Sequence, residues 1–154
     1  MTANPLLARA RAAAAAVADP EIPTLTIEDL GILRDVVLDG ETVVATVTPS
    51  YSGCPATEPI ARAVSEALVN AGFPNASVRT VLTPAWSSDC ITEAGRRKLA
   101  ETGIAPPDRR RATPACPLCG AGETELISQF GGTPCKALHR CLACREPFEA
   151  FKCH

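Results

Sequence analysis

The sequence is poor in aromatic residues, in histidine and in net charge. Aromatic residues make up 4% of its 154 residues, it has two histidines, and its formal net charge is -2. A balance this close to neutral supplies no overall basic field, so we expect no nucleic acid partner. Both histidines, His139 and His154, lie near the C-terminus. We therefore expect no Cys-His or Ser-His-Asp catalytic arrangement in the N-terminal part, and no enzymatic activity of the chain alone.

Membrane spans, signal peptides and phosphate-binding loops are missing as well. No stretch approaches the roughly 20 apolar residues of a membrane span, and the alanine-rich start is interrupted by Arg9 and Arg11. No glycine-rich phosphate loop is present, which argues against a nucleotide-driven enzyme. These absences predict a cytoplasmic protein with no membrane partner. In a reducing compartment, the eight cysteines are better explained as metal ligands or reactive thiols than as disulfides.

Four of these cysteines form two C-x-x-C pairs near the C-terminus. The pairs are Cys116 with Cys119 and Cys141 with Cys144. Each pair can fold around one metal ion through a tight turn, and the residues between them suffice for a β-hairpin. About 40 residues cannot bury enough apolar surface to fold without help, so the metal stabilises the tail. Four thiolates with no open position predict structural zinc, with rubredoxin-like iron as the alternative.

Other potential ligands lie in the same tail, and two interpretations of them stay open. Cys135 and Cys153 can approach each other and hold a labile metal or cluster. Alternatively, Cys135 is a small buried apolar residue, and Cys153 and His154 form a frayed terminus. The roles of His139 and His154 are not decided by their spacing.

The remaining sequence predicts a small α+β domain. Residues 3–18 form a helix, and residues 32–38 and 42–48 form a hairpin around Asp39-Gly40. Residues 56–71 predict a second helix, 76–82 a third strand and 91–101 a third helix. The expected fold is a mainly antiparallel sheet of three or four strands covered by helices, followed by a zinc-ribbon β-hairpin. We expect domain boundaries at 1–107 and 115–154, with 108–114 as the linker.

Two groups in this first domain carry reactive side chains. Cys54 lies between a predicted strand and a predicted helix, where the positive end of the helix dipole favours a thiolate. A buried, inert cysteine is an equally acceptable interpretation. Asp19 and Glu21 flank Pro20, and they are either turn residues or hard ligands that face Cys54 and suit iron. Cys90 either joins them or is a core residue at the start of a helix.

Several segments together resemble a known family. Asp19-Pro20-Glu21-Ile22-Pro23, Asp29-Leu30-Gly31 and Ser52-Gly53-Cys54-Pro55 resemble the metal–sulfur cluster assembly domain of SufT-like proteins. The chain also resembles the PaaD family of phenylacetate degradation in Pro84-Ala85-Trp86 and in residues 51–58, 103–107, 130–138, 144–148 and 151–153. These segments cover essentially the whole chain.

The resemblance implies an accessory component of phenylacetyl-CoA epoxidase, a multicomponent di-iron oxygenase. Such a component matures an iron–sulfur cluster, with the 2Fe–2S reductase of the epoxidase as the expected partner. It implies that Cys54 is the reactive cysteine, that Asp19 and Glu21 form the acidic motif, and that iron or a cluster binds transiently in addition to structural zinc. Two other classes stay open: a redox electron carrier with a rubredoxin-like iron site, and a non-catalytic structural subunit of the oxygenase. A homodimer stays open as well.

Overall fold

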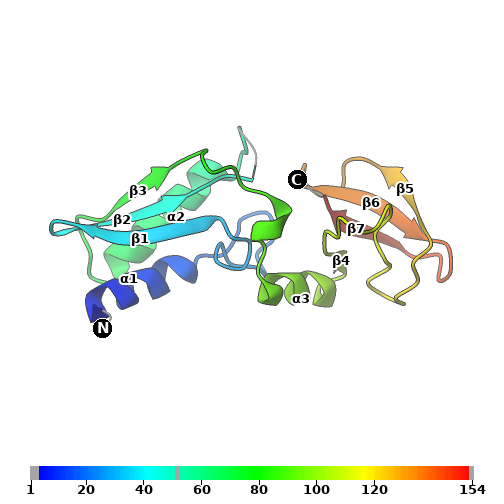
Figure 1. The fold of residues 1–154 in the computed structure, drawn as a ribbon, viewed down its shortest axis with the longest axis horizontal. Coiled ribbons are helices and arrows are strands. Elements are labelled where there is room, and N and C mark those ends of the chain that lie inside the picture. Colours follow the sequence, from blue (N-terminus) through cyan, green and yellow to red (C-terminus); the bar gives the residue numbers. More distant parts are fainter. Residues whose placement is uncertain (1–3, 51–52, 153–154) are drawn as a thin grey trace. The chain divides into compact units, whose positions relative to one another are not determined.

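The computed structural model describes residues 4–50 and 53–152 (Figure 1). The chain divides into two compact units, Met1–Thr92 and Glu93–His154. In the described residues, no helix is long and apolar enough to cross a bilayer.

The first unit begins with helix α1, Pro5–Ala15. The side chain of Asn4 caps it by accepting a hydrogen bond from the N–H of Leu6 at 3.0 Å, and Pro5 occupies the first helical position, where its missing N–H costs nothing. Ala10 and Ala14 are fully buried on the inner face. Because both side chains are small, α1 can pack closely against the strands and against the second helix.

A three-stranded sheet of order β1-β2-β3 forms the centre of this unit. Strands β1 (Leu33–Asp39) and β2 (Thr42–Val47) are antiparallel and turn at Gly40, which has φ +65°. Helix α2 (Thr57–Asn70) returns the chain to the starting end of β2, so that β3 (Ser77–Thr80) runs parallel to β2. The largest fully buried residues of this unit are aliphatic: Leu25, Ile27, Val43, Val47, Val64 and Leu68.

The second unit holds a short helix and a second sheet. Helix α3 (Glu93–Glu101) leads into β4 (Ile104–Ala105), and β5 (Thr124–Ser128), β6 (Lys136–Cys141) and β7 (Pro147–Phe151) follow. The strand order is β4-β7-β6-β5, with β4 parallel to β7 and the other pairs antiparallel. One core cluster contains the following buried residues: Ala105, Cys116, Cys141, Phe148 and Ala150.

The predicted α+β class is confirmed, and the structure adds two details. The first sheet is mixed, because the helix between β2 and β3 makes that pair parallel. The ribbon is larger than a hairpin, because Ile104 and Ala105 pair with β7 and are buried. The division between units therefore falls after Thr92, whereas the sequence places the end of the first domain at residue 107.

Candidate functional site

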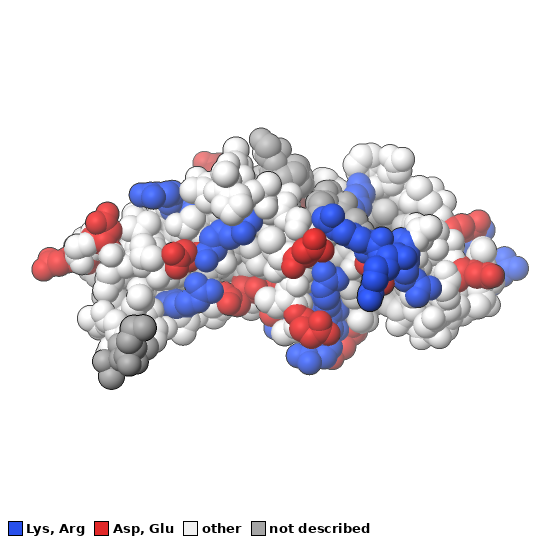
Figure 2. Space-filling view, viewed as in Figure 1, with Lys and Arg blue, Asp and Glu red and all other residues white. Residues whose placement is uncertain are grey.

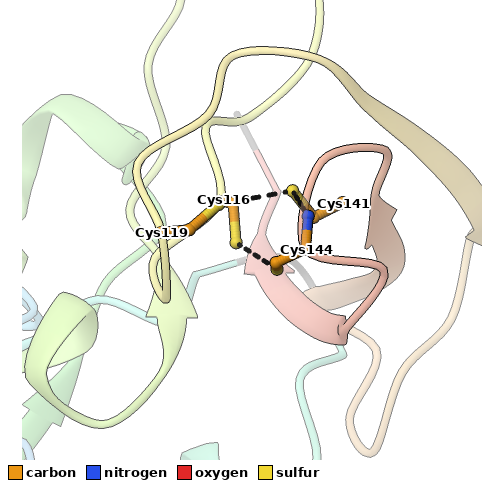
Figure 3. A group of neighbouring side chains, drawn as sticks. All are labelled: Cys116, Cys119, Cys141 and Cys144. Atoms are coloured by element: carbon orange, nitrogen blue, oxygen red, sulfur yellow. Dashed lines mark hydrogen bonds between the residues drawn. The ribbon is translucent and has the colours of Figure 1, made fainter.

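Four cysteine side chains converge in the second unit (Figure 3). One sulfur atom from each of Cys116, Cys119, Cys141 and Cys144 lies within 4.8 Å of the other three. The Sγ atoms of Cys116 and Cys144 are 3.8 Å apart, and those of Cys119 and Cys141 are 3.5 Å apart. Four sulfur atoms held at about 2.3 Å from one tetrahedral zinc ion are separated by about 3.8 Å. The donor set and its spacing therefore fit a single tetrahedral ion.

The two knuckles, residues 116–120 and 141–145, share one backbone geometry. The N–H of Gly120 donates to the carbonyl oxygen of Cys116 at 2.9 Å, and the N–H of Arg145 donates to that of Cys141 at 3.1 Å. Gly120 has φ +80° and Arg145 has φ +69°. This left-handed residue turns each loop so that both thiols of the pair face the same point. Glycine takes the conformation readily, whereas Arg145 takes it at a cost.

Backbone N–H groups point at the sulfur atoms. The Sγ of Cys141 accepts hydrogen bonds from Ala143 and Cys144, both at 3.4 Å. The N–H of Cys144 contributes most to lowering the pKa of Cys141 to about 6. For Cys144, the N–H of Glu146 favours the thiolate, but burial and the neighbouring thiols raise the pKa to about 12. Four thiolates so close together repel one another, so a cation between them is needed for all four to ionise.

Cys54 lies at the edge where β2 ends, α2 begins and β3 ends. In the described residues, it lines an open depression of about 460 Å³ together with Glu58 and Thr80. The Cys54 side chain is partly exposed, and the hydroxyl of Ser50 donates to its Sγ at 3.9 Å. Carboxyl ends of parallel strands beside a helix N-terminus are where open sheets of this kind bind ligands. Cys54 is therefore an accessible thiol at the part of this fold best suited to hold a ligand.

Sequence reasoning singled out Cys54 but did not identify Glu58 or Thr80 as its neighbours. Glu58 lies in the first turn of α2, four residues after Cys54. That spacing across a helix start is the only pattern that could have identified Glu58. Thr80 reaches the depression only through the parallel pairing of β3 with β2.

The acidic loop before β1 is held by its own carboxylate. Asp19 is 5% exposed, and its Oδ1 accepts hydrogen bonds from the N–H groups of Glu21 and Ile22, both at 2.9 Å. These are the contacts of a turn residue. Among the described residues, the four-cysteine group is the only cluster of three or more potential ligands. Asp19, Glu21 and Cys54 therefore do not converge as three ligands of one ion.

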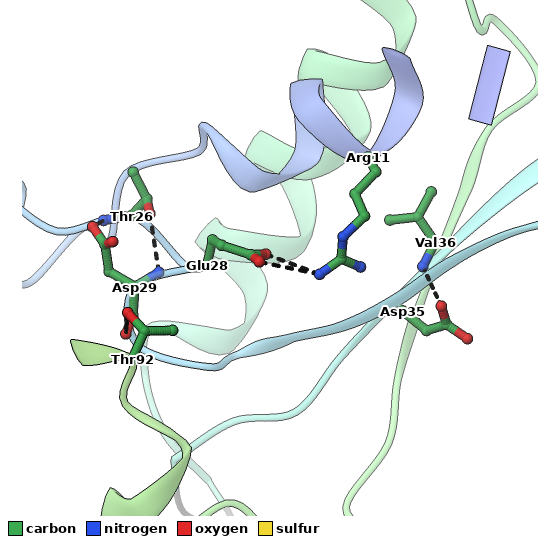
Figure 4. Close-up of polar contacts among 7 residues, drawn as sticks. All are labelled: Arg11, Thr26, Glu28, Asp29, Asp35, Val36 and Thr92. Atoms are coloured by element: carbon green, nitrogen blue, oxygen red, sulfur yellow. Dashed lines mark hydrogen bonds and ion pairs between the residues drawn. The ribbon is translucent and has the colours of Figure 1, made fainter. Parts of the chain in front are cut away.

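A second acidic turn follows, and the segment before α3 packs on it (Figure 4). The N–H of Thr26 donates to Asp29 Oδ2 at 3.0 Å, and the N–H of Asp29 donates to Thr26 Oγ1 at 3.1 Å. Thr92 donates through both its N–H and its hydroxyl to the carbonyl of Asp29. The buried indole of Trp86 donates to the carbonyl of Leu30 at 2.8 Å. Asp29-Leu30-Gly31 and Pro84-Ala85-Trp86 thus secure each other.

The other cysteines and histidines are apart from the four-cysteine group. Cys135 is buried, with its Sγ 3.1 Å from the hydroxyl of Thr133. Cys90 is partly exposed, in the 3-10 turn Ser88–Cys90. The ring of His139 stacks on Phe148 at a centroid distance of 5.8 Å, and burial lowers its pKa. The predictions for Cys153 and His154 lie outside the described residues.

Comparisons with known proteins agree with this division. The family described as PaaD zinc beta ribbon domain matches residues 104–152, and the family described as iron-sulfur cluster assembly protein matches residues 7–82. The chain is 48% identical over 143 residues to a protein of Escherichia coli (strain K12) that is described as a 1,2-phenylacetyl-CoA epoxidase subunit. That alignment covers 89% of this chain and 87% of the relative. The chain belongs to the PaaD family. The family ribbon includes β4, as the pairing of β4 with β7 does.

Solved structures resemble the first part of this PaaD family member. A DUF59 domain of unknown function from Bacillus anthracis is 28% identical, with a TM-score of 0.56. The match covers 62% of this chain and 92% of that domain. A Mycobacterium tuberculosis protein associated with Fe–S complex assembly and repair is 33% identical over 64% of this chain and 86% of its own, with a TM-score of 0.36.

Proposed function

We propose that this chain is an accessory factor that helps to assemble an iron–sulfur cluster in a component of phenylacetyl-CoA epoxidase, with the 2Fe–2S reductase as the client. The observation that carries the proposal is the partly exposed thiol of Cys54 in an open depression. This thiol lies within the part of the chain that matches the iron-sulfur cluster assembly family. The name of the Escherichia coli relative supports the choice of the epoxidase as the client system.

Cys54 is the reactive residue in this proposal. Thiolate is the ligand that iron–sulfur clusters use in proteins, and the cluster here is cargo that passes to the client. The depression beside Cys54 leaves the thiol open to a second protein, whereas Cys135 is buried. Asp19 keeps the loop of residues 19–22 in shape through its hydrogen bonds to the backbone.

The four-cysteine group has a different role in the proposal. Cys116, Cys119, Cys141 and Cys144 hold one structural zinc ion, which closes the two knuckles on each other. Because all four positions of a tetrahedral ion are filled by the chain, the ion supplies stability and no open position for chemistry. Iron in the same ligands would instead make the second unit an electron carrier. Metal analysis of the purified protein distinguishes the two, since we expect one zinc ion per chain and no visible absorption.

The proposal is tested by producing the reductase component together with wild-type chain or with Cys54→Ala. We expect the variant to keep its zinc and its fold and to lower the iron and acid-labile sulfide content of the reductase several-fold. Cys90→Ala is the matched control, because Cys90 is also a partly exposed thiol of the first unit. Equal cluster content with Cys54→Ala and wild type would refute the role of Cys54. Equal content with and without the chain would refute the proposed function.

A further inference from the structure

A hollow in the second unit lies outside both sites described above. It has a volume of about 160 Å³ and lies between strands β6 and β7 and the segment that follows β4. We call it the ribbon hollow. Its lining comprises Ala137 and His139 from β6, Ala150 and Phe151 from β7, the following Lys152, and residues 106–108, 111, 112 and 114.

The walls of the ribbon hollow are largely apolar. Ala137 and Ala150 are cross-strand partners, so two methyl groups lie side by side on the sheet. Both residues are less than 10% exposed, at 7% and 4%. Pro106, Pro107 and Pro114 add apolar surface from the opposite segment. A cavity of about 150 Å³ accepts a molecule the size of benzene, so the ribbon hollow has room for one aromatic or large aliphatic side chain.

The rim of the ribbon hollow is basic. Arg111 and Lys152 line it, and the exposed Arg109 and Arg110 precede Arg111 in the chain. The one carboxylate in the lining, Asp108, accepts hydrogen bonds from the N–H and the Nε of Arg110. Those two hydrogen bonds and the nearby arginine charges hold the pKa of Asp108 below its usual range. Figure 2 shows the resulting concentration of Lys and Arg over the region that follows β4 in Figure 1.

A polar atom in the lining also lacks a protein partner. The Nδ1 of His139 is buried and has no hydrogen-bond partner among the described residues. Buried polar atoms of this kind are normally paired with protein or with water. A polypeptide backbone that enters the ribbon hollow could offer His139 a hydrogen-bonding group, which an apolar small molecule could not.

We propose that the ribbon hollow is a docking site for an acidic polypeptide segment with one apolar anchor residue. The anchor fills the hollow, and flanking carboxylates pair with Arg110, Arg111 and Lys152. Arginine forks match carboxylates in geometry as well as in charge, and a central anchor within a charged rim is the usual anatomy of a binding hot spot. The slightly acidic chain as a whole disfavours a nucleic acid in the same place. The inference deepens the proposed function by locating the surface where a client docks.

Synthetic peptides test the site independently of cluster assembly. The probe is a terminally blocked peptide of sequence DEFDE, added to the isotope-labelled, zinc-loaded full chain and followed by amide NMR. We expect shifts at Ala137, Phe151 and Lys152. Replacing the peptide's phenylalanine with glycine should weaken binding at least tenfold, since the anchor is lost. Replacing its acidic residues with lysine should abolish binding.

Variants of the chain locate the interaction. Arg111→Glu should weaken DEFDE binding about fivefold or more, because it removes one carboxylate pair and adds a repulsion. Ala137→Leu should block the hollow, and its amide spectrum shows whether the sheet is retained. Arg79→Glu on β3 is the control for overall charge, and it should bind the peptide as wild type does. Tighter binding of a DNA duplex than of DEFDE would overturn the proposal, and so would equal shifts with the glycine peptide.

Phenylacetate is a further probe, because a small aromatic acid shares the chemistry of an apolar group beside a carboxylate. We expect it to bind the ribbon hollow at least tenfold more weakly than DEFDE, since it makes one charge pair in place of several. If phenylacetate binds as tightly as the peptide, the hollow is a small-molecule site and the docking proposal is wrong. If DEFDE binds as proposed while client maturation does not depend on the chain, the docking site stands and only the proposed function fails.

Discussion

Gly31 lies against the backbone of Cys90, and its substitution by alanine tests how the two acidic and Trp86-containing segments are held together. A Cβ added at Gly31 would lie 2.2 Å from the carbonyl oxygen of Cys90 and 2.7 Å from its carbonyl carbon. Gly31 also has φ +70°, where a side chain costs about 1–2 kcal/mol. Forcing the two backbones apart adds about 1–3 kcal/mol, the usual cost of overpacking. We therefore expect Gly31→Ala to lower the free energy of unfolding by about 2–5 kcal/mol.

Gly40→Ala is the matched control for this experiment. Gly40 has φ +65°, and a Cβ there would meet nothing within 4 Å. It should therefore show the conformational cost alone, about 1–2 kcal/mol. Both glycines lie in the first unit. Any difference between the two variants then measures the contact of Gly31 with Cys90.

Urea denaturation followed by tryptophan fluorescence measures both variants. The chain has one tryptophan, Trp86, which is buried in the first unit, so its signal reports that unit. Cys90→Ala combined with Gly31→Ala should not restore stability, because the closest blocking atoms belong to the Cys90 backbone. Equal losses in Gly31→Ala and Gly40→Ala would show that the close approach of the two segments carries no energy.

The second unit offers three further predictions. Removing the metal with a strong chelator should unfold this unit, seen by loss of its amide dispersion, while Trp86 fluorescence stays native, because structural zinc contributes on the order of 10 kcal/mol to such folds. Arg145→Gly should stabilise the zinc-loaded unit by about 0.5–1 kcal/mol in chelator-free thermal unfolding, since glycine relieves the left-handed strain; Gly120→Ala should do the opposite. Glu149→Gln should cost about 1–3 kcal/mol in the same assay, because the largely buried ammonium of Lys136 loses its charged partner at 3.3 Å; no change would show that the pair is neutral to stability.

The knuckles could be predicted from the sequence because their geometry is local. A C-x-x-C pair and the residue after it determine the turn, and Gly120 fits its left-handed position by residue type. Arg145 occupies the same position without any such indication. The Asp39-Gly40 turn and the first two helices are local in the same sense, and the structure has them within a few residues of their expected bounds.

Long-range pairing accounts for what the sequence could not provide. Ile104 and Ala105 look like the end of the first domain, yet they pair with Glu149 and Ala150, far along the chain. Residue type alone also leaves two roles open for Asp19, a turn residue or a metal ligand. The structure shows its carboxylate bonded to the backbone of its own loop. Such a choice depends on where the loop closes, which no local pattern fixes.

The separation of Cys54 from other ligands limits how the proposed factor can work. Iron–sulfur clusters are held by four protein ligands, typically cysteine thiolates. Among the described residues, no group of three or more potential ligands includes Cys54. One chain therefore supplies one thiolate of the four, and the rest must come from the client, from a second copy or from a small thiol. An incomplete ligand set binds its cargo weakly, which suits transfer better than storage. The four-thiolate group is the opposite case, because its ligand set is complete and its ion has no reason to leave.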